Sequence, residues 1–174
     1  MENQVAKSNV VLFGASPVSF WTAKFAAELG FSCLVLDNEP SKFAPFAQLA
    51  GVECRQVDFT ALPAYEELGI GADTCACVLT RGHSFDPQSF VYAMQSPAYY
   101  VGMMGRAVKN AKCVAYALEH GCTQEMIDRC TFPIGEKIGA IDAAEIGLSV
   151  AAQLVRVNNE HFPREKDKES LHRE

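Results

Sequence analysis

Long apolar runs are absent from this 174-residue sequence. No stretch approaches the roughly 20 apolar residues that a membrane-spanning helix requires. The amino terminus also lacks the order of a signal peptide, in which basic residues precede an apolar run, because it contains Glu2, Asn3 and Gln4. We therefore expect a cytoplasmic protein with no membrane partner.

An excess of positive charge is absent as well. The formal net charge is −6 at pH 7, and the pI is about 5.2. Proteins that bind the nucleic-acid backbone carry basic stripes or patches instead. The composition therefore argues against a general nucleic-acid-binding role, and we expect no nucleic acid among the partners.

Motifs for metal binding and redox chemistry are missing too. The seven cysteines include no C-x-x-C pair, and the histidines include no i, i+4 pair. We therefore expect no metal site, and we interpret the cysteines as free core thiols in a reducing compartment. A redox role for Cys122 or Cys130 is the alternative, because both lie near predicted turns.

The sequence does contain a regular alternation of strand and helix patterns. The predicted strands are Val10–Phe13, Ser32–Asp37, Glu53–Val57, Thr74–Thr80 and Tyr99–Met103. The predicted helices are Val18–Leu29, Phe43–Leu49, Ala64–Leu68, Pro87–Gln95, Arg106–His120, Gln124–Arg129 and Ala143–Val155. This order predicts a Rossmann-like, doubly wound α/β fold with a mainly parallel sheet of about five or six strands and helices on both faces.

The chain length fits a single domain. With 49% hydrophobic residues, the sequence can bury a core of its own. We predict that residues 1–157 form the domain. Residues 158–174 are rich in charge and poor in apolar residues, so we expect a mobile, solvated tail there.

The turn after the first predicted strand resembles a dinucleotide-binding glycine loop from which two glycines are missing. Gly14 keeps the first position of G-x-G-x-x-G, whereas Ser16 and Ser19 occupy the other two. On a functional interpretation, Gly14, Ala15 and Ser16 allow a phosphate to approach the start of the helix. The alternative needs no ligand, because Ser16 followed by Pro17 is a good helix start in its own right.

Asp37 ends the second predicted strand. An acidic residue at this place commonly accepts a hydrogen bond from a ribose hydroxyl, which predicts a binding role for Asp37. The alternative is a turn-forming role, since Asn38, Glu39 and Pro40 follow at once.

The fourth predicted strand leads into a polar run from Thr80 to Asp86. Ligands of open parallel sheets bind outside the carboxyl ends of the strands, so Thr80 and His83 are expected to face the glycine loop. Asp86 would then orient the imidazole of His83 for ligand binding or acid–base chemistry. In the alternative, Asp86 caps the next helix and His83 is simply exposed.

The fifth predicted strand is followed by Gly105 and Arg106, with Lys109 and Lys112 downstream. A glycine before a helix start with basic residues favours an anion, and the Arg106 guanidinium suits a phosphate. The alternative for the two lysines is a solvated helix face. A glycine-punctuated loop at residues 132–140 is either the lip of the pocket or only a connection.

Three motifs in this order resemble the carboxy-terminal Rossmann domain of the XdhC/CoxI family, the accessory factors of xanthine dehydrogenase and related molybdenum hydroxylases. The matching motifs are the turn from Thr80 to Asp86 with its His83, the run Ser96-Pro97-Ala98-Tyr99-Tyr100-Val101-Gly102 with Met104-Gly105, and Pro133-Ile134-Gly135 with Ile138-Gly139-Ala140 and Ala144-Glu145-Ile146. With the first strand, its loop and Asp37, the resemblance spans residues 1–157.

The resemblance implies maturation of a molybdenum enzyme. Members of the family are similar in binding molybdenum cofactor and delivering it to a hydroxylase apoenzyme. The expected ligand is thus phosphate-bearing, either molybdenum cofactor or NAD(P). The expected partners are a molybdenum hydroxylase apoenzyme or a separate chain of the family's amino-terminal type, and we expect a homodimer without turnover of its own.

Two other classes of protein stay open from the sequence alone. One is an NAD(P)-dependent oxidoreductase or redox-sensing module, for which His83 is the proton donor that we can nominate. The other is an interaction module that binds no ligand and recognises its partner through a surface patch.

Overall fold

The computed structural model describes residues 7–80 and 85–163. Five strands form one sheet in the order β3-β2-β1-β4-β5, and every neighbouring pair is parallel. The strands are β1 (Asn9–Phe13), β2 (Ser32–Asp37), β3 (Val52–Gln56), β4 (Thr74–Val78) and β5 (Tyr100–Met103). The predicted Rossmann-like sheet is confirmed.

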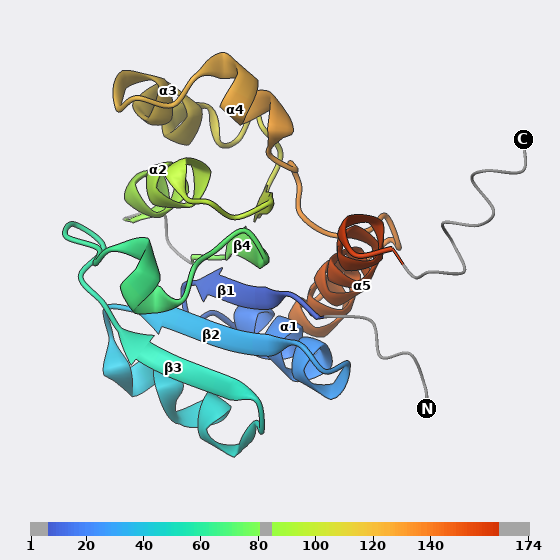
Figure 1. The fold of residues 1–174 in the computed structure, drawn as a ribbon. Helices are drawn as coiled ribbons and strands as arrows, with labels where there is room; N and C mark the ends of the chain where they lie inside the picture. The colour runs from blue at the N-terminus through green and yellow to red at the C-terminus, as the bar shows by residue number, and fades with distance from the viewer. Residues whose placement is uncertain (1–6, 81–84, 164–174) are drawn as a thin grey trace, which may run out of the picture.

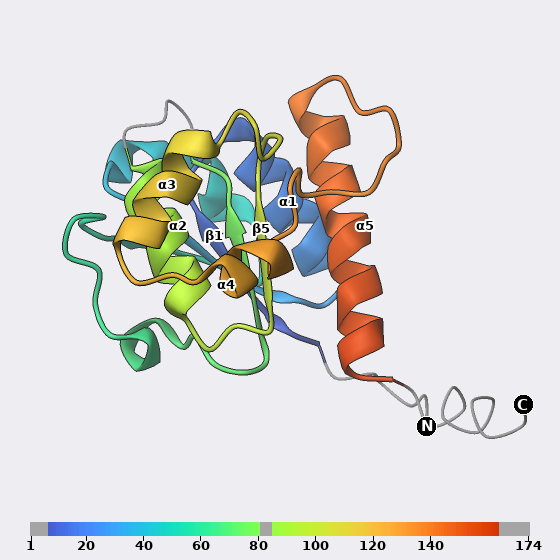
Figure 2. The ribbon, with the colours of Figure 1, turned by 90° about the horizontal axis from the view of Figure 1, so that it is seen from above.

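Helices cover both faces of this sheet (Figure 1). The α-helices are α1 (Pro17–Glu28), α2 (Asp86–Gln95), α3 (Ala111–Glu119), α4 (Gln124–Arg129) and α5 (Ala143–His161), and the 3-10 helices are η1 (Pro40–Gln48) and η2 (Tyr65–Leu68). Helices α2, α3 and α4 lie on one face, whereas α1 and α5 pack together on the other (Figures 1 and 2). The doubly wound arrangement is thus confirmed as well.

The strands are apolar on both faces because both faces are covered. Within β1, Val11 and Phe13 belong to the core beneath α2 and α3, while Val10 and Leu12 belong to the core beneath α1 and α5. Successive side chains of a strand point to opposite faces, so a strand between two helical layers needs apolar residues at every position. β1 therefore lies at the centre of both cores.

The chain reverses its direction of winding at β1. After β3 it returns past β1 to β4, so β1 is flanked by β2 on one side and by β4 on the other. The loops that follow β1 and β4 diverge at this point and leave a crevice at the carboxyl ends of the strands. Ligands of such folds bind there.

Some predicted boundaries differ from the structure. The segments predicted as helices at 43–49 and 64–68 form the 3-10 helices η1 and η2, and Pro45 inside η1 cannot donate an α-helical hydrogen bond. The helix predicted from Arg106 begins at Ala111 instead, because residues 106–110 form turns. That correction removes Arg106 from a helix amino terminus.

Helix α5 continues to His161, beyond the predicted end at Val155. Asn158, which the sequence assigned to the tail, is buried, and its side-chain oxygen accepts a hydrogen bond from the Ser8 backbone N–H at 2.9 Å. The His161 ring stacks on Tyr99 with 3.7 Å between centroids. The segment from 158 to 161 is therefore part of the packed domain, and residues 164–174 lie outside the described part of the chain.

Candidate functional site: a pocket at the carboxyl ends of β1, β2 and β4

A cavity of about 370 Å³ lies in the crevice beside β1. The loop after β1 and the end of β2 form part of its wall, and Thr80 after β4 completes it. Four residues predicted from the sequence thus come together: Ala15, Ser16, Asp37 and Thr80. Gly14 lies directly behind them, at the end of β1.

At Gly14 the glycine loop passes very close to Thr80, which follows β4. Its φ is +98°, and a Cβ added to it would lie 2.6 Å from the Thr80 Cα. Side chains rarely adopt such a φ, and no backbone atom tolerates a carbon at that distance. The predicted approach of Thr80 to the glycine loop is therefore confirmed, and it requires glycine at position 14.

Ser16 and Ser19 bond within the loop. Ser16 is the N-cap of α1, and its Oγ accepts a hydrogen bond from the Ser19 backbone N–H at 3.1 Å. The hydroxyl of Ser19, which is fully buried, donates to the Gly14 carbonyl at 2.5 Å. The capping interpretation of Ser16 and Pro17 is thus confirmed, and Ser19 takes the third glycine position with a satisfied hydroxyl.

This loop retains few backbone donors for an anion. The Ala15 N–H donates to Asp37 Oδ2 at 2.8 Å, the Ser19 N–H is capped, and Pro17 has no N–H. Within the described residues, the backbone N–H groups of Ser16 and Val18 have no acceptor. A phosphate at this helix start would therefore meet two free donors.

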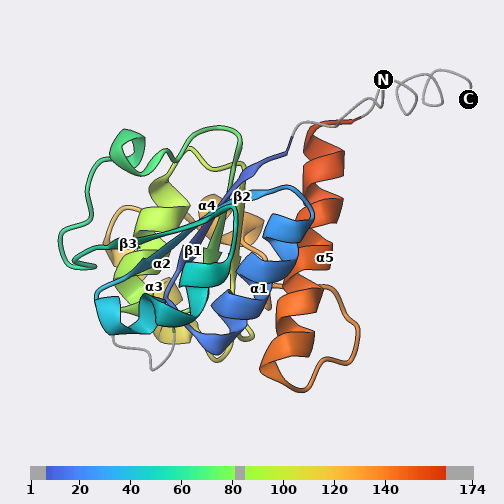
Figure 3. The ribbon, with the colours of Figure 1, turned by 90° about the horizontal axis from the view of Figure 1, so that it is seen from below.

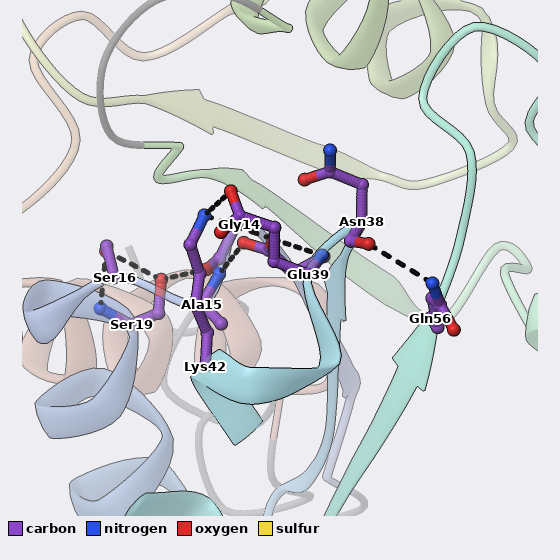
Figure 4. Close-up of polar contacts among 9 residues, drawn as sticks. Gly14, Ala15, Ser16, Ser19, Asn38, Glu39, Lys42 and Gln56 are labelled. Carbon is purple, nitrogen blue, oxygen red and sulfur yellow. Dashed lines mark hydrogen bonds and ion pairs between the residues drawn. The ribbon is translucent and has the colours of Figure 1, made fainter. Parts of the chain in front are cut away.

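Asp37 is held on several sides. Only 4% of it is exposed, and besides Ala15 it accepts hydrogen bonds at Oδ1 from the Glu39 N–H at 3.0 Å and the Lys42 ammonium at 3.3 Å (Figure 4). The Glu39 carboxylate lies 2.8 Å from the same ammonium, and hydrogen bonding to Glu39 is the main reason why the pKa of Lys42 is raised. Two carboxylates and one ammonium leave this wall with one negative charge.

Thr80 connects the pocket to helix α2. Its hydroxyl donates a hydrogen bond to the carboxylate of Asp86, which is buried at the first position of the helix. Phe85, and not Asp86, is the N-cap of α2, so the predicted cap at Asp86 is wrong. His83 lies outside the described residues, and its predicted pairing with Asp86 stays a prediction.

The apolar wall of the pocket was not predicted. Phe59 and Phe85 both line the cavity, and their rings pack with 5.5 Å between centroids and 30° between planes. Asn38 also lines it, and its side-chain amide points away from Gln56, whose Nε2 donates to the Asn38 carbonyl (Figure 4). Phe59 follows the carboxyl end of β3, and this position in the sequence could have indicated that it lies near the pocket.

Gly105 and Arg106 do not line this pocket. The Asn110 side-chain amide donates to the carbonyls of Met104, at 2.9 Å, and Gly105, at 3.2 Å, which closes the turn, and Arg106 is exposed on it. The loop at 132–140 lies away from the pocket too, and its Gly135 N–H donates to the buried Gln153.

The seven cysteines are free thiols. Burial raises the pKa of Cys33 and Cys130 to about 12 and that of Cys75 to about 11, so these thiols stay protonated at neutral pH. Burial also raises the pKa of Cys122, which argues against a reactive thiolate there. Among the described residues, no three metal-ligating side chains cluster, and no helix has the length and apolarity to cross a membrane.

The sheet order, the glycine turn after β1 and the pocket beside it define a Rossmann-like α/β domain. Comparison with known families makes this specific, because residues 10–154 match the family described as the XdhC Rossmann domain. The chain therefore belongs to the XdhC Rossmann domain family, which confirms the resemblance seen in the sequence.

Similar proteins extend this comparison. Over 88% of its length, the chain is 30% identical to the uncharacterized protein YqeB of Escherichia coli, of which it covers 28%. Over 86% it is 27% identical to a probable xanthine dehydrogenase subunit of Bacillus subtilis, of which it covers 43%. A crystal structure described as a xanthine dehydrogenase from Bacillus halodurans has the same fold, with a TM-score of 0.70 and 22% identity over 90% of this chain and 44% of that one. The chain thus spans less than half the length of these relatives.

Proposed function

We propose that this domain is an accessory factor for a molybdenum hydroxylase of the xanthine dehydrogenase type, and that its pocket binds a phosphate-bearing ligand. Molybdenum cofactor is the first candidate and a dinucleotide the second. The observation that carries the proposal is the match of residues 10–154 to the XdhC Rossmann domain. The name of the Bacillus subtilis relative, a probable xanthine dehydrogenase subunit, supports the choice of partner.

The residues of the pocket are compatible with such a ligand. A volume of about 370 Å³ lies within the usual range of small-molecule sites. The free N–H groups of Ser16 and Val18 are suited to a phosphate oxygen, with Lys42 as the neighbouring cation. The rings of Phe59 and Phe85 offer an apolar wall for a flat heterocycle.

The first experiment measures retention of molybdenum cofactor by the purified chain. Ser16→Trp fills the pocket with an indole ring, and we expect cofactor retention to be lost. Lys42→Gln removes the ammonium without touching the core, and we expect about tenfold weaker binding, the usual scale for one charge-assisted hydrogen bond.

Lys24→Gln is the matched control. Lys24 lies over the Trp21 ring on α1 and does not line the pocket. Unchanged retention in both Ser16→Trp and Lys42→Gln would refute the pocket as the cofactor site. A second measurement adds the chain to a molybdenum hydroxylase apoenzyme and follows the recovery of hydroxylase activity, which we expect to rise in the presence of the parent chain.

The position of Asp37 at the end of β2 favours the dinucleotide as second candidate. Its buried carboxylate has spare lone pairs for a ribose hydroxyl, and its charge disfavours a second phosphate nearby. In isothermal titration we expect binding of NADH to exceed binding of NADPH. Absence of heat with either ligand at millimolar concentration would exclude this candidate.

A further inference from the structure

Helices α3 and α4 leave an apolar groove on the surface, away from the candidate pocket. Its volume is about 620 Å³, and its walls include Val108, Leu118, Ile127 and Phe132. Val108 is 87% exposed and Leu118 is 42% exposed, although both are large aliphatic residues. Contiguous apolar surface of this kind usually marks a site where another protein binds.

The outward face of α3 forms one side of this groove. Ala111, Ala115 and Leu118 follow one another at helical spacing, and all three line the groove and are exposed. The outward face of a helix in a globular protein is normally polar, so an apolar outward face indicates that something covers it. Because alanine side chains are small, larger side chains of an occupant have room above them.

The groove offers few hydrogen bonds to the backbone of an occupant. Apart from Gln124 and Asp128, which bond to each other at 2.8 Å, its lining is apolar. The edge of the sheet at β5 is already covered, since the Thr131 N–H donates to the Val101 carbonyl and its own carbonyl accepts from the Met103 N–H, both at 3.0 Å. An occupant must therefore satisfy its own N–H and C=O groups, which an α-helix does.

The end of the groove at the start of α3 carries three cations. Arg106, Lys109 and Lys112 are exposed there, and within the described residues none of them forms an ion pair. Acidic residues stand elsewhere on the rim, with Glu119 at the far end of α3 and Asp128 on α4. A complementary occupant therefore carries its acidic residues at the end that meets the cations. Acidic residues are most favourable in the first turn of a helix, so that end is its amino terminus.

We propose that this groove binds an amphipathic helix of another protein, with apolar anchors at i, i+3, i+4 and i+7 and acidic residues in its first turn. The anchors pack between Val108, Leu118 and Phe132, and the acidic side chains meet Arg106 and Lys109. The groove lies away from the candidate pocket, so this docking surface does not depend on what the pocket binds.

The test uses a fluorescently labelled synthetic peptide of about 16 residues, which is long enough to form a helix. Its leucines follow the i, i+3, i+4, i+7 pattern, and its first turn holds glutamates. A second peptide has lysines in place of the glutamates. By fluorescence anisotropy we expect the full chain to bind the acidic peptide with a Kd of about 10 µM. We expect the basic peptide to bind at least about tenfold more weakly, because its lysines face the cations.

Variants of the chain locate the binding site. Ala115→Glu places a charge in the centre of the apolar face, and we expect the acidic peptide to bind about tenfold more weakly or worse. Ala152→Glu is the matched control, because Ala152 is exposed on α5, which lies apart from α3 in Figures 1 and 3. Lys109→Glu combined with Lys112→Glu is expected to reverse the preference between the two peptides. Circular dichroism checks that each variant is folded.

Three results would overturn the proposal: no binding of the acidic peptide to the parent chain at about 1 mM, equal binding of both peptides, or unchanged binding by folded Ala115→Glu. Sedimentation of the same proteins without peptide tests a different occupant. If the parent chain is a dimer and Ala115→Glu is a folded monomer, the groove belongs to a second copy of the chain, and the proposal is overturned as well.

Discussion

At the scale of single residues, the glycine loop is built from contacts that a glycine pattern does not show. Ser19 occupies the third glycine position and stays fully buried, because its hydroxyl bonds to the Gly14 carbonyl. Ser16 caps the Ser19 N–H, and Asp37 accepts from the Ala15 N–H. The loop therefore holds its shape through its own side chains.

Gly14→Ala is expected to destabilise the domain by about 2–5 kcal/mol, since the methyl group both opposes the positive φ and meets the Thr80 backbone. Gly30→Ala is the matched control. Gly30 has a φ of +88° but no atom within 4 Å of an added Cβ, so only the conformational cost of about 1–2 kcal/mol applies. Urea unfolding measures both, and equal losses would contradict the steric role of Gly14.

The sequence allowed several of these residues to be predicted. Ser16 and Pro17 formed a recognisable helix start, and Thr80 was expected beside the loop because neighbouring parallel strands end together. The bond from Ala15 to Asp37 could not be predicted, since it joins residues 22 positions apart through a side-chain rotamer. Phe59 and Phe85 were missed for a similar reason, because their contact depends on the conformations of the loop after β3 and the segment before α2.

At the scale of the elements, the ends of helices were the least predictable feature. The periodicity of α5 was visible up to Val155, but the helix continues because Asn158 accepts hydrogen bonds from Ser8, just before β1, and His161 stacks on Tyr99, just before β5. Those partners are distant in sequence, so a local pattern carries no sign of them. The start of α3 was misjudged because Gly105 and Asn110 close a separate turn before it.

Asn158→Ala is expected to cost about 1–3 kcal/mol, because the buried Ser8 N–H and hydroxyl lose the oxygen to which they donate. Glu160→Ala, at a nearby exposed position whose carboxylate forms a surface ion pair with Arg156, serves as control and is expected to change stability by less than about 0.5 kcal/mol. Thermal unfolding compares the two. Equal stability of both variants would show that the bond to Ser8, just before β1, does not fix the last turn of α5.

At the scale of the whole molecule, buried thiols link stability to pH. Cys33 keeps its proton in the folded state up to about pH 12, whereas the unfolded chain loses that proton near pH 9. The stabilisation is therefore complete below pH 9 and is lost as the pH rises from 9 toward 12. Each such thiol contributes a slope of up to about 1.4 kcal/mol per pH unit.

We expect urea unfolding between pH 8 and pH 11 to show falling stability above pH 9. In Cys33→Ala we expect the free energy of unfolding to fall less steeply with pH, by up to about 1.4 kcal/mol per pH unit, which corresponds to one proton. The other buried thiols account for the rest of the fall. Cys54→Ala provides a comparison, because burial raises the pKa of this half-buried thiol to a smaller extent. An identical slope in the parent and in Cys33→Ala would contradict this account.

Because the loop after β1 is held by hydrogen bonds of its own side chains and of Asp37, glycine substitutions alone would not create a dinucleotide-binding turn. Exchanging Ser16 and Ser19 for glycine would recreate the spelling of a dinucleotide fingerprint, but it would remove the cap of α1 and a buried hydrogen bond. The Ala15 N–H would still be committed to Asp37, and Pro17 would still supply no donor. A pyrophosphate-binding turn at this place therefore requires coordinated changes in β2 and α1 as well as two glycines.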